Sequence, residues 1–336
     1  MNIRHLGLQL LLLATLHAKP LVWIYTDMSD STIKGGNKEG TLNDPDDISA
    51  MAAYLLMANE FKTLGIVVAS THRPEHAKTP DQAEWATRYF GGAYAADRPG
   101  LEKNIGGFPE TITFTESCIK KTSERYNPEK SYEDLGKHST VQALHDAARK
   151  TESPIHVLCW GSLTEPAILV RHCLESGNKD ILKRLVFIAH WTDSPLNQGT
   201  PEHPENVANC REDAKACAYM KARALAGDII YYECGAIGQT GIVSGAPKGK
   251  DYYDAYRTSR LGTAFVEGKY VFNGVDHSDS ATFWVLLGNY GVTLKQIANN
   301  GTNSAEVEAI NRDSFRDHSK KIHDELLRRS RAASQP

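Results

Sequence analysis

The stretch that decides the fold reads Leu21-Val22-Trp23-Ile24-Tyr25-Thr26-Asp27, followed after a polar loop by Asn43-Asp44-Pro45-Asp46-Asp47-Ile48. Its first part is apolar almost to its end, which predicts a buried strand that ends in a carboxylate. Its second part predicts the start of a helix, with Asp44 as the N-cap and Pro45 in the first helical position. A strand and a helix of this kind gather negative charge at the sheet edge where open α/β folds place ligands.

Further apolar segments of strand length alternate with helical patterns along the chain. The expected strands are 64–69, 155–160, 185–190 and 228–234; the expected helices are 48–56, 81–94, 141–149, one running through Cys173, 213–225, 281–287 and the tail from 305. Alternation of this kind predicts an α/β fold with a mostly parallel sheet flanked by helices. The stretch 100–137 is irregular and punctuated by Gly and Pro, as expected of an insertion or a lid.

Composition restricts the class of protein. The chain has 336 residues, a formal net charge of -3 and 41% hydrophobic residues. Such a chain can bury a large core, and it lacks the strongly basic character of a nucleic-acid-binding protein. We see no clean domain boundary, so we expect residues 19–336 to form one α/β domain. Homo-oligomerisation stays open.

The first residues have the pattern of an export signal. Arg4 and His5 precede an apolar run at 6–16, and the small residue Ala18 follows. This run is short for a membrane span, and the pattern is typical of a signal peptide cleaved near Ala18. A retained anchor or a first core helix are the alternatives. We therefore expect residues 1–18 to be removed and the mature protein to be secreted or periplasmic, without a membrane segment.

Six cysteines permit disulfides in an exported protein. Cys159 and Cys234 fall in expected buried strands, where a free thiol packs as a small hydrophobe. Cys210 and Cys217 are two helical turns apart, so within one helix they cannot bond to each other. Mostly unpaired core thiols are therefore expected.

Carboxylates are the strongest sign of a functional site. Asp27 ends the first strand, and Asp46 and Asp47 start the helix that follows. Calcium prefers several oxygen ligands, and carboxylates in this arrangement can supply them. The alternative is that the helix residues only stabilise the helix start, with Asp27 solvated.

Two other segments carry candidate site residues. Asp276, His277 and Asp279 precede a late helix, where either aspartate is a candidate cap and His277 a candidate substrate-binding residue. Between strand and helix, Gly161 after Trp160 either lets the backbone approach a ligand closely or only permits a tight turn. This turn lacks the Gly-x-Ser-x-Gly pattern of a hydrolase nucleophile, and no Gly-rich phosphate loop follows a strand.

These segments together resemble the nucleoside hydrolase superfamily, and more closely its exported nucleoside-hydrolase-like branch, some members of which carry a cellulose-binding label. The matching pieces are 22–27, Asp44-Pro45-Asp46-Asp47, 158–165, Asn209 with Asp213-Ala214, and Asp279. They extend over nearly the whole mature chain. Their order and positions carry the resemblance, since each piece alone is short.

The resemblance implies a calcium ion at the sheet edge that holds a ribose while an N-glycosidic bond is cleaved. By position, the metal ligands would be Asp27, Asp47, Asp279 and the Trp160 carbonyl. Asp27 would also take the proton of the attacking water, and Asp46 and Asn209 would hold sugar hydroxyls.

Three features depart from the family pattern. Tyr25 stands where nucleoside hydrolases have a further aspartate, and Ser70, Thr71 and His72 stand near an expected asparagine. A long loop, 28–42, also separates the strand from the aspartate pair, so that Asp30 or Asp44 competes for the same roles.

The leading hypothesis is an exported, calcium-dependent hydrolase of N-glycosidic bonds in nucleosides or related ribosides. The alternative is a carbohydrate-binding protein, of cellulose-binding type, that keeps the scaffold without turnover. A third hypothesis, an O-glycoside hydrolase that uses two of these carboxylates, depends on their separation.

Overall fold

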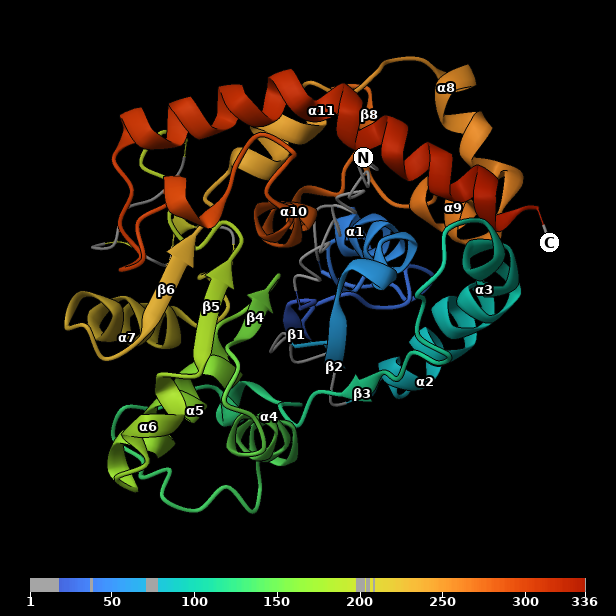
Figure 1. Cartoon of the computed structure of the whole chain (residues 1–336). Helices are drawn as coiled ribbons and strands as arrows, with labels where there is room; N and C mark the ends of the chain where they lie inside the picture. Colours follow the sequence, from blue (N-terminus) through green and yellow to red (C-terminus); the bar gives the residue numbers. More distant parts are fainter. Residues whose placement is uncertain are drawn as a thin grey trace, which may run out of the picture.

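The protein is built on a parallel sheet of six strands in the order β3-β2-β1-β4-β5-β6 (Figure 1). The computed structural model describes residues 18–36, 39–70, 78–197, 203, 206–207 and 209–335. Its strands are β1 (Leu21–Tyr25), β2 (Lys62–Val68), β3 (Thr115–Glu116), β4 (Ile155–Cys159), β5 (Leu185–Ala189) and β6 (Ile230–Glu233), with a separate hairpin of β7 (Tyr270–Val271) and β8 (Gly274–Val275). The predicted mostly parallel sheet is confirmed.

Helices cover both faces of this sheet. They are α1 (Asp46–Leu56), α2 (Gln82–Ala86), α3 (Gly92–Asn104), α4 (Ser139–Arg149), α5 (Thr164–Glu175), α6 (Lys179–Leu182), α7 (Ala214–Leu225), α8 (Lys250–Asp254), α9 (Arg260–Phe265), α10 (Ala281–Leu287) and α11 (Ala305–Ala333). Helices α1 and α11 pack on one face, and α4, α5 and α7 on the other (Figure 1). The helix expected at 281–287 has those bounds.

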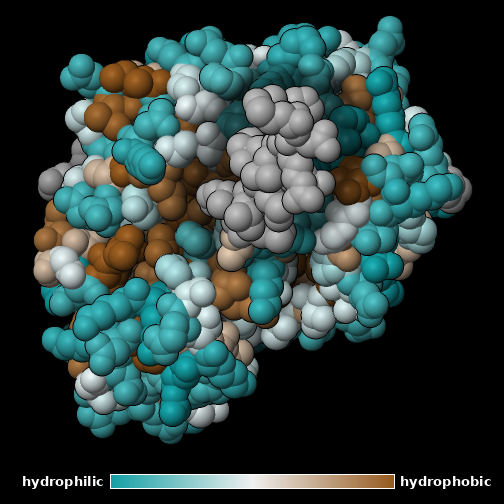
Figure 2. Space-filling model, in the orientation of Figure 1, coloured by the Kyte–Doolittle hydropathy of each residue, from teal (hydrophilic) through white to brown (hydrophobic). Residues whose placement is uncertain are grey.

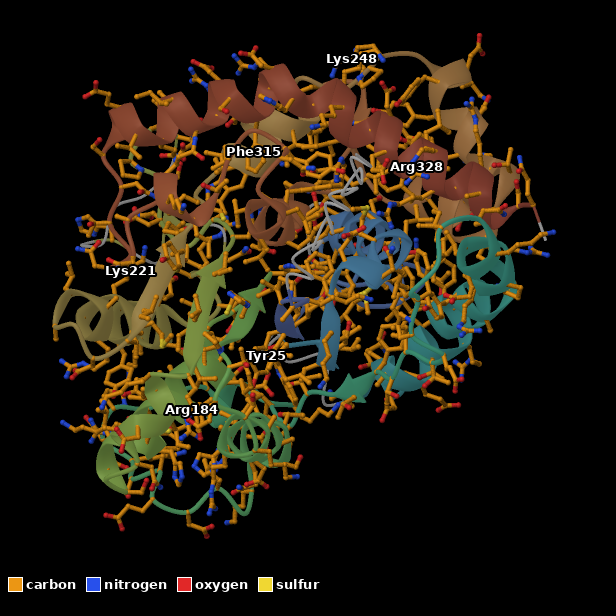
Figure 3. All side chains as sticks on the ribbon, in the orientation of Figure 1. Tyr25, Arg184, Lys221, Lys248, Phe315 and Arg328 are labelled. Atoms are coloured by element: carbon orange, nitrogen blue, oxygen red, sulfur yellow. A yellow bond between two sulfur atoms is a disulfide. The ribbon has the colours of Figure 1, made fainter. Side chains whose placement is uncertain are left out.

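The central strands are buried on both faces. In β1, Val22 and Ile24 join the core that includes α1, while Trp23 and Tyr25 join the core that includes α5. Tyr25, labelled in Figure 3, lies near the middle of the sheet and is fully buried. Burial of both faces explains why the strands read as continuous apolar runs rather than as alternating patterns.

The strand order reverses between β1 and β4. From β1 the chain builds β2 and β3 on one side, then returns to pair β4 with the other side of β1. Tyr25, the last residue of β1, pairs with Cys159, the last residue of β4. The loops that leave these two strands diverge, so a crevice opens at their carboxyl ends.

The expected helix at 81–94 is longer in the structure. Asp81 caps α2, a π-helical turn follows at Thr87–Gly91, and α3 continues to Asn104. The rest of the stretch expected to be irregular contributes the short edge strand β3. The sequence pattern therefore predicted the start of this helical segment, at Asp81, but not its end, at Asn104.

Asp44 does not cap α1, contrary to expectation. The residue before the helix is Pro45, and no side-chain cap hydrogen bond is found for α1 among the described residues. The carboxylate of Asp44 instead pairs with Lys269, 225 positions away. A tertiary ion pair has replaced the local hydrogen bond.

Cys210 and Cys217 form a disulfide, with their Cα atoms 5.5 Å apart. The expectation that they cannot bond assumed one continuous helix, but α7 begins at Ala214 and Cys210 lies in the turn before it. Cys118, Cys159, Cys173 and Cys234 are free thiols.

Hydrophilic residues dominate much of the face shown in Figure 2, with hydrophobic residues gathered mainly on the side of β5 and β6. Across the described ranges, no helix has the length and apolar character needed to cross a membrane. The expected signal peptide lies almost wholly outside the described residues.

Candidate functional site

A cavity of about 780 Å³ opens at the carboxyl ends of the central strands. The residues that line it come from the loops after β1, β3, β4 and β5, the start of α1, and three later segments. They are Asp27, Gly36, Glu39, Asp44, Asp46, Asp47, Arg125, Trp160, His190, Trp191, Asn197, Asn209, Arg211, Glu212, Gln239, Lys269 and Asp279. The cavity therefore occupies the point where the strand order reverses.

Three carboxylates from distant parts of the chain meet in this cavity. One oxygen each of Asp46, Asp47 and Asp279 lies within 4.8 Å of the other two. The first two residues lie in the first turn of α1, and Asp279 lies in a 3-10 turn, Ser278–Ser280, just before α10. Only the tertiary fold brings these segments together.

Asp27 lies beside this trio and hydrogen-bonds to Asp47. Burial and the negative charge of Asp47 hold the pKa of Asp27 well above its usual range. The pKa of Asp47 is raised in the same way, by burial and by the charge of Asp279. Like charges this close need a cation or a shared proton, because each disfavours ionisation of the others.

Hydrogen bonds from the β1 loop hold these aspartates in place. Thr26 Oγ1 donates to Asp47 Oδ1, and Asn43 Nδ2 donates to the backbone carbonyl of Asp27. The Thr26 hydroxyl also accepts a bond from the backbone N–H of Met28, at 3.1 Å. The end of β1 and the start of α1 are therefore tied together at the site.

Lys269 is a cavity residue that sequence reasoning missed. Its ammonium lies 2.7 Å from both carboxylate oxygens of Asp44, 3.4 Å from Asp46 Oδ2 and 3.6 Å from Asp276 Oδ2. These aspartates raise the pKa of Lys269 above its usual range, against the effect of burial. An isolated lysine between a glycine and a tyrosine carries no sequence signal, so only the structure could reveal this role.

His190 was also missed, although it ends the β5 segment. Its Nε2 lies 3.7 Å from Asp279 Oδ1. Burial and the charge of Lys269 lower its pKa to about 3, so the imidazole is neutral near pH 7. A histidine that directly follows a parallel strand could have been identified as a site candidate by its place at the sheet edge.

Trp160 and Asn209 meet at the cavity wall. Asn209 Nδ2 donates to the carbonyls of Trp160 and His190, each at 2.8 Å. The carbonyl expected to bind a metal therefore already has one partner, and a carbonyl oxygen has a second lone pair. Besides lining the cavity, Asn209 connects the residue after β4 to the residue after β5 through these two hydrogen bonds.

His277, which was expected to bind substrate, is not among the described residues that line the cavity. It is fully buried, with Nδ1 2.8 Å from Ser280 Oγ and Nε2 3.2 Å from His323 Nε2. Its ring packs against Phe265, with centroids 5.1 Å apart. Burial and the neighbouring His323 lower the pKa of His277 well below its usual range.

Two of the three departures from the family pattern are the long loop after β1 and the segment after β2, and their residues lie in different parts of the structure. Asp44 lines the cavity, whereas the carboxylate of Asp30 accepts from Thr32 on its own loop. Ser70 is buried and donates to Glu165 at 2.6 Å. Thr71 and His72 fall outside the described residues.

The donor set fits a hard divalent cation. Among the described residues, Asp46 Oδ1 and Asp279 Oδ2 are buried with no hydrogen-bond partner. Buried carboxylate oxygens without partners are costly unless a cation or a water compensates them. Calcium and magnesium both take ligands of this type, and calcium is the more tolerant of irregular geometry.

Part of the chain matches a known protein family. Residues 40–188 match a protein-family model described as the nucleoside hydrolase-like domain of cellulose-binding Sde182. A search of curated proteins found no match.

Solved structures share the fold at low sequence identity. A nucleoside hydrolase-related hypothetical protein from Saccharophagus degradans, associated with carbohydrate metabolism, is 16% identical and has a TM-score of 0.63, over 95% of this chain and 72% of that one. The effector protein XOO4466 is 11% identical with a TM-score of 0.55, over 94% of each chain. An inosine-uridine preferring nucleoside hydrolase from Bacillus anthracis is 14% identical with a TM-score of 0.47, over 94% of this chain and 100% of that one. Residues 40–188 therefore match the Sde182 nucleoside hydrolase-like family model, in agreement with the resemblance seen in the sequence, and the structures with TM-scores of 0.63 and 0.55 share the fold of this chain.

Proposed function

We propose that this protein is an exported, calcium-dependent hydrolase of N-glycosidic bonds in nucleosides or related ribosides. One observation carries the proposal: Asp46, Asp47 and Asp279 meet within 4.8 Å at the switch point of a nucleoside hydrolase-like sheet. No other set of three acidic, histidine or cysteine side chains that could hold a metal is found among the described residues.

Each carboxylate has a role in this proposal. Asp46, Asp47 and Asp279 would hold the calcium ion, with Asp27 and the Trp160 carbonyl as further oxygen ligands. Asp46 contributes one carboxylate oxygen to the trio, and its Oδ2 lies 3.4 Å from Lys269 Nζ. Asp46 and Asn209, which both line the cavity, are the candidates to hold the sugar hydroxyls.

The reaction adds water across the bond between the ribose C1′ and the base nitrogen. When bound, a calcium ion would lower the pKa of water and orient the sugar hydroxyls. Asp27, whose pKa is raised by burial and Asp47, accepts the proton of the attacking water. The acidic cavity stabilises positive charge on the ribosyl ring as the base departs.

The proposal is tested with purified protein, inosine, uridine and adenosine, in calcium or in EDTA, by measuring free base. Base release should need calcium and fall at least 100-fold in Asp47→Ala. Asp279→Asn, which keeps the side-chain size, should lose activity too and guards against a misfolded Asp47 variant. Asp30→Asn, an aspartate outside the cavity, should keep it. Absence of release from every riboside, or release that EDTA leaves unchanged, would reject the proposal.

A second candidate is carbohydrate binding without turnover. The matching family is described as cellulose-binding, and the similar Saccharophagus degradans protein is associated with carbohydrate metabolism. Binding of cello-oligosaccharides together with no base release from any riboside would favour this candidate.

Export is supported by the disulfide between Cys210 and Cys217, since such bonds persist in oxidising compartments. Expression with residues 1–18 present, followed by N-terminal sequencing of the secreted or periplasmic protein, should show cleavage near Ala18. Full-length protein retained in the cytoplasm would exclude this location.

A further inference from the structure

One buried hydroxyl group joins two separate parts of the wall of the acidic cavity. The indole Nε1 of Trp160, the residue after β4, donates to Thr282 Oγ1 at 2.8 Å, and that hydroxyl donates to the backbone carbonyl of Asp279, also at 2.8 Å. A hydroxyl has one proton to donate and lone pairs with which to accept, so both bonds form at once. The three residues therefore make one continuous hydrogen-bond chain.

This hydrogen-bond chain is closed to water. Thr282 is fully buried, and Trp160 and Asp279 are each only 1% exposed. Thr282 lies in the first turn of α10, which meets the carboxyl end of β4 (Figure 1). A hydrogen bond in the low-dielectric interior is electrostatically stronger than one in water, so the chain holds its members firmly in place.

The two bonds of the Thr282 hydroxyl differ in range. A threonine in a helix commonly bonds to a carbonyl three residues earlier, so the bond to Asp279 is a local one. The bond from Trp160 spans 122 positions and attaches the turn Ser278–Ser280 to the sheet. Asp279 also approaches His190, but its Oδ1 lies 3.7 Å from the imidazole Nε2, too far for a hydrogen bond.

Trp160 is itself held at three points. Its backbone N–H donates to the Tyr25 carbonyl at 2.9 Å, its carbonyl accepts from Asn209 at 2.8 Å, and its indole donates to Thr282. The same residue would offer its carbonyl to the calcium ion, to which Asp279 would offer its carboxylate. Thr282 therefore lies between two candidate ligands that come from distant parts of the chain.

We propose that Thr282 is a positioning residue of the metal site, whose hydroxyl fixes the Asp279 turn relative to Trp160. This inference rests on the calcium site of the proposed function. Calcium accepts ligand oxygens at about 2.3–2.6 Å, so a shift of Asp279 by a fraction of an ångström weakens its coordination. Thr282 is not among the described residues that line the cavity, and it acts through its two partners.

A purely structural role for this hydroxyl leads to a different expectation. Without the hydroxyl, the indole N–H of Trp160 is left buried and unsatisfied, which lowers stability in either case. Only a positioning role also weakens calcium binding. Removal of a hydrogen bond behind a metal ligand typically lowers metal affinity by about 10–100-fold. Metal affinity and stability must therefore be measured separately.

The test measures calcium binding to the purified protein by calorimetry, after treatment with EDTA and dialysis. Thr282→Val removes the hydroxyl and keeps the shape of the side chain, and the calcium Kd should rise by at least about tenfold. Thr282→Ser keeps the hydroxyl and should bind calcium nearly as the wild type does. Circular dichroism and urea unfolding without calcium report whether each variant folds.

Thr140→Val is the matched control. Thr140 is 1% exposed, and its hydroxyl likewise accepts one bond, from the backbone N–H of Cys118, and donates another, to Glu165. None of these three residues is among the described residues that line the acidic cavity. This variant should lose stability while its calcium Kd keeps the wild-type value.

A double-mutant cycle tests whether the hydroxyl acts together with Trp160. Trp160→Phe removes the indole N–H, keeps the backbone carbonyl, and should raise the calcium Kd by itself. Thr282→Val should then raise the Kd much less in the Trp160→Phe protein than in the wild type, because both changes break the same bond. Equal effects in the two backgrounds would contradict the inference. Trp160→Phe also replaces Thr282→Val as the test if the valine variant does not fold.

Three further outcomes decide the inference. Wild-type calcium affinity in folded Thr282→Val would overturn it, as would an equal loss in Thr282→Ser, which would assign the effect to side-chain shape. A wild-type protein that binds no calcium would reject the metal site and this inference together. A protein whose calcium binding depends on the Thr282 hydroxyl, but which releases no base from any riboside, would support the inference and reject only the proposed hydrolysis.

Discussion

Gly161 lies directly against the side chain of Asp27. A Cβ atom built on Gly161 would be 2.7 Å from Asp27 Cβ and 3.0 Å from Asp27 Cγ. Real Cβ atoms essentially never approach other atoms this closely, so the glycine after β4 leaves the space that the aspartate after β1 occupies. The contact joins the two strands on either side of the switch point.

Gly161→Ala should therefore move Asp27 out of position. We expect riboside hydrolysis to fall at least tenfold while the circular dichroism spectrum is unchanged, since the methyl group displaces a site residue and not a core element. Gly92→Ala is the matched control, because a Cβ there has no neighbour within 4 Å and alanine favours the helix. Equal turnover in Gly161→Ala and wild type would show that the position of Asp27 does not matter.

Lys269→Met should destabilise the fold. The change leaves Asp44, Asp46 and Asp276 without their shared cation, and removing one partner of a buried ion pair costs about 3 kcal/mol or more. Urea unfolding in EDTA measures the loss. Lys250→Met, whose ion pair with Asp254 is exposed, should change stability by less than about 1 kcal/mol. Equal stabilities of the two variants would contradict the role assigned to Lys269.

The disulfide should tie Asn209 and Arg211 to the cavity wall. Protein unfolded without reductant should expose four alkylatable thiols of its six cysteines, and all six after reduction. The double variant Cys210→Ser with Cys217→Ser should lose about 2.5 kcal/mol of stability, the chain-entropy value for a loop of this length. Six reactive thiols before reduction would rule the bond out.

The buried carboxyl group of Glu165 should make the stability of the fold depend on pH. Its buried carboxylate accepts hydrogen bonds from Ser70 and Ser117, and burial raises its pKa despite these donors. A folded-state pKa above the unfolded value favours the fold most at low pH, and this contribution is lost as pH rises through the folded pKa.

Glu165→Gln removes that titration. The stability of wild type minus that of the variant should therefore fall as pH rises from about 4.3, the unfolded pKa of glutamate, towards 7. Urea unfolding of both proteins at several pH values measures this difference in the free energy of unfolding. For Glu110→Gln, an exposed site, the corresponding difference should change little. A difference for Glu165→Gln that is flat or grows with pH would contradict the pKa shift.

The strands and several helices could be predicted because their signals are local. The apolar runs around 21–27 and 185–190 are strands, and the helix at 281–287 has its predicted bounds. Asp44 and Cys210 show where local rules failed. Asp44 does not cap its helix but forms an ion pair with Lys269, far along the chain. Cys210 lies in a turn before α7 that the helical pattern did not reveal.

The sequence by itself determined the alternation of strands and helices, and hence a parallel sheet with carboxylates at its edge. Hydrophobic periodicity and helix-terminal residues act over a few positions, so one chain displays them without reference to its fold. The tertiary structure alone decided that Asp279 joins Asp46 and Asp47, that Lys269 joins Asp44, and that His277 packs against His323 instead. Each of these contacts joins residues tens to hundreds of positions apart, and only the packing of the whole sheet and its helices sets which of them meet.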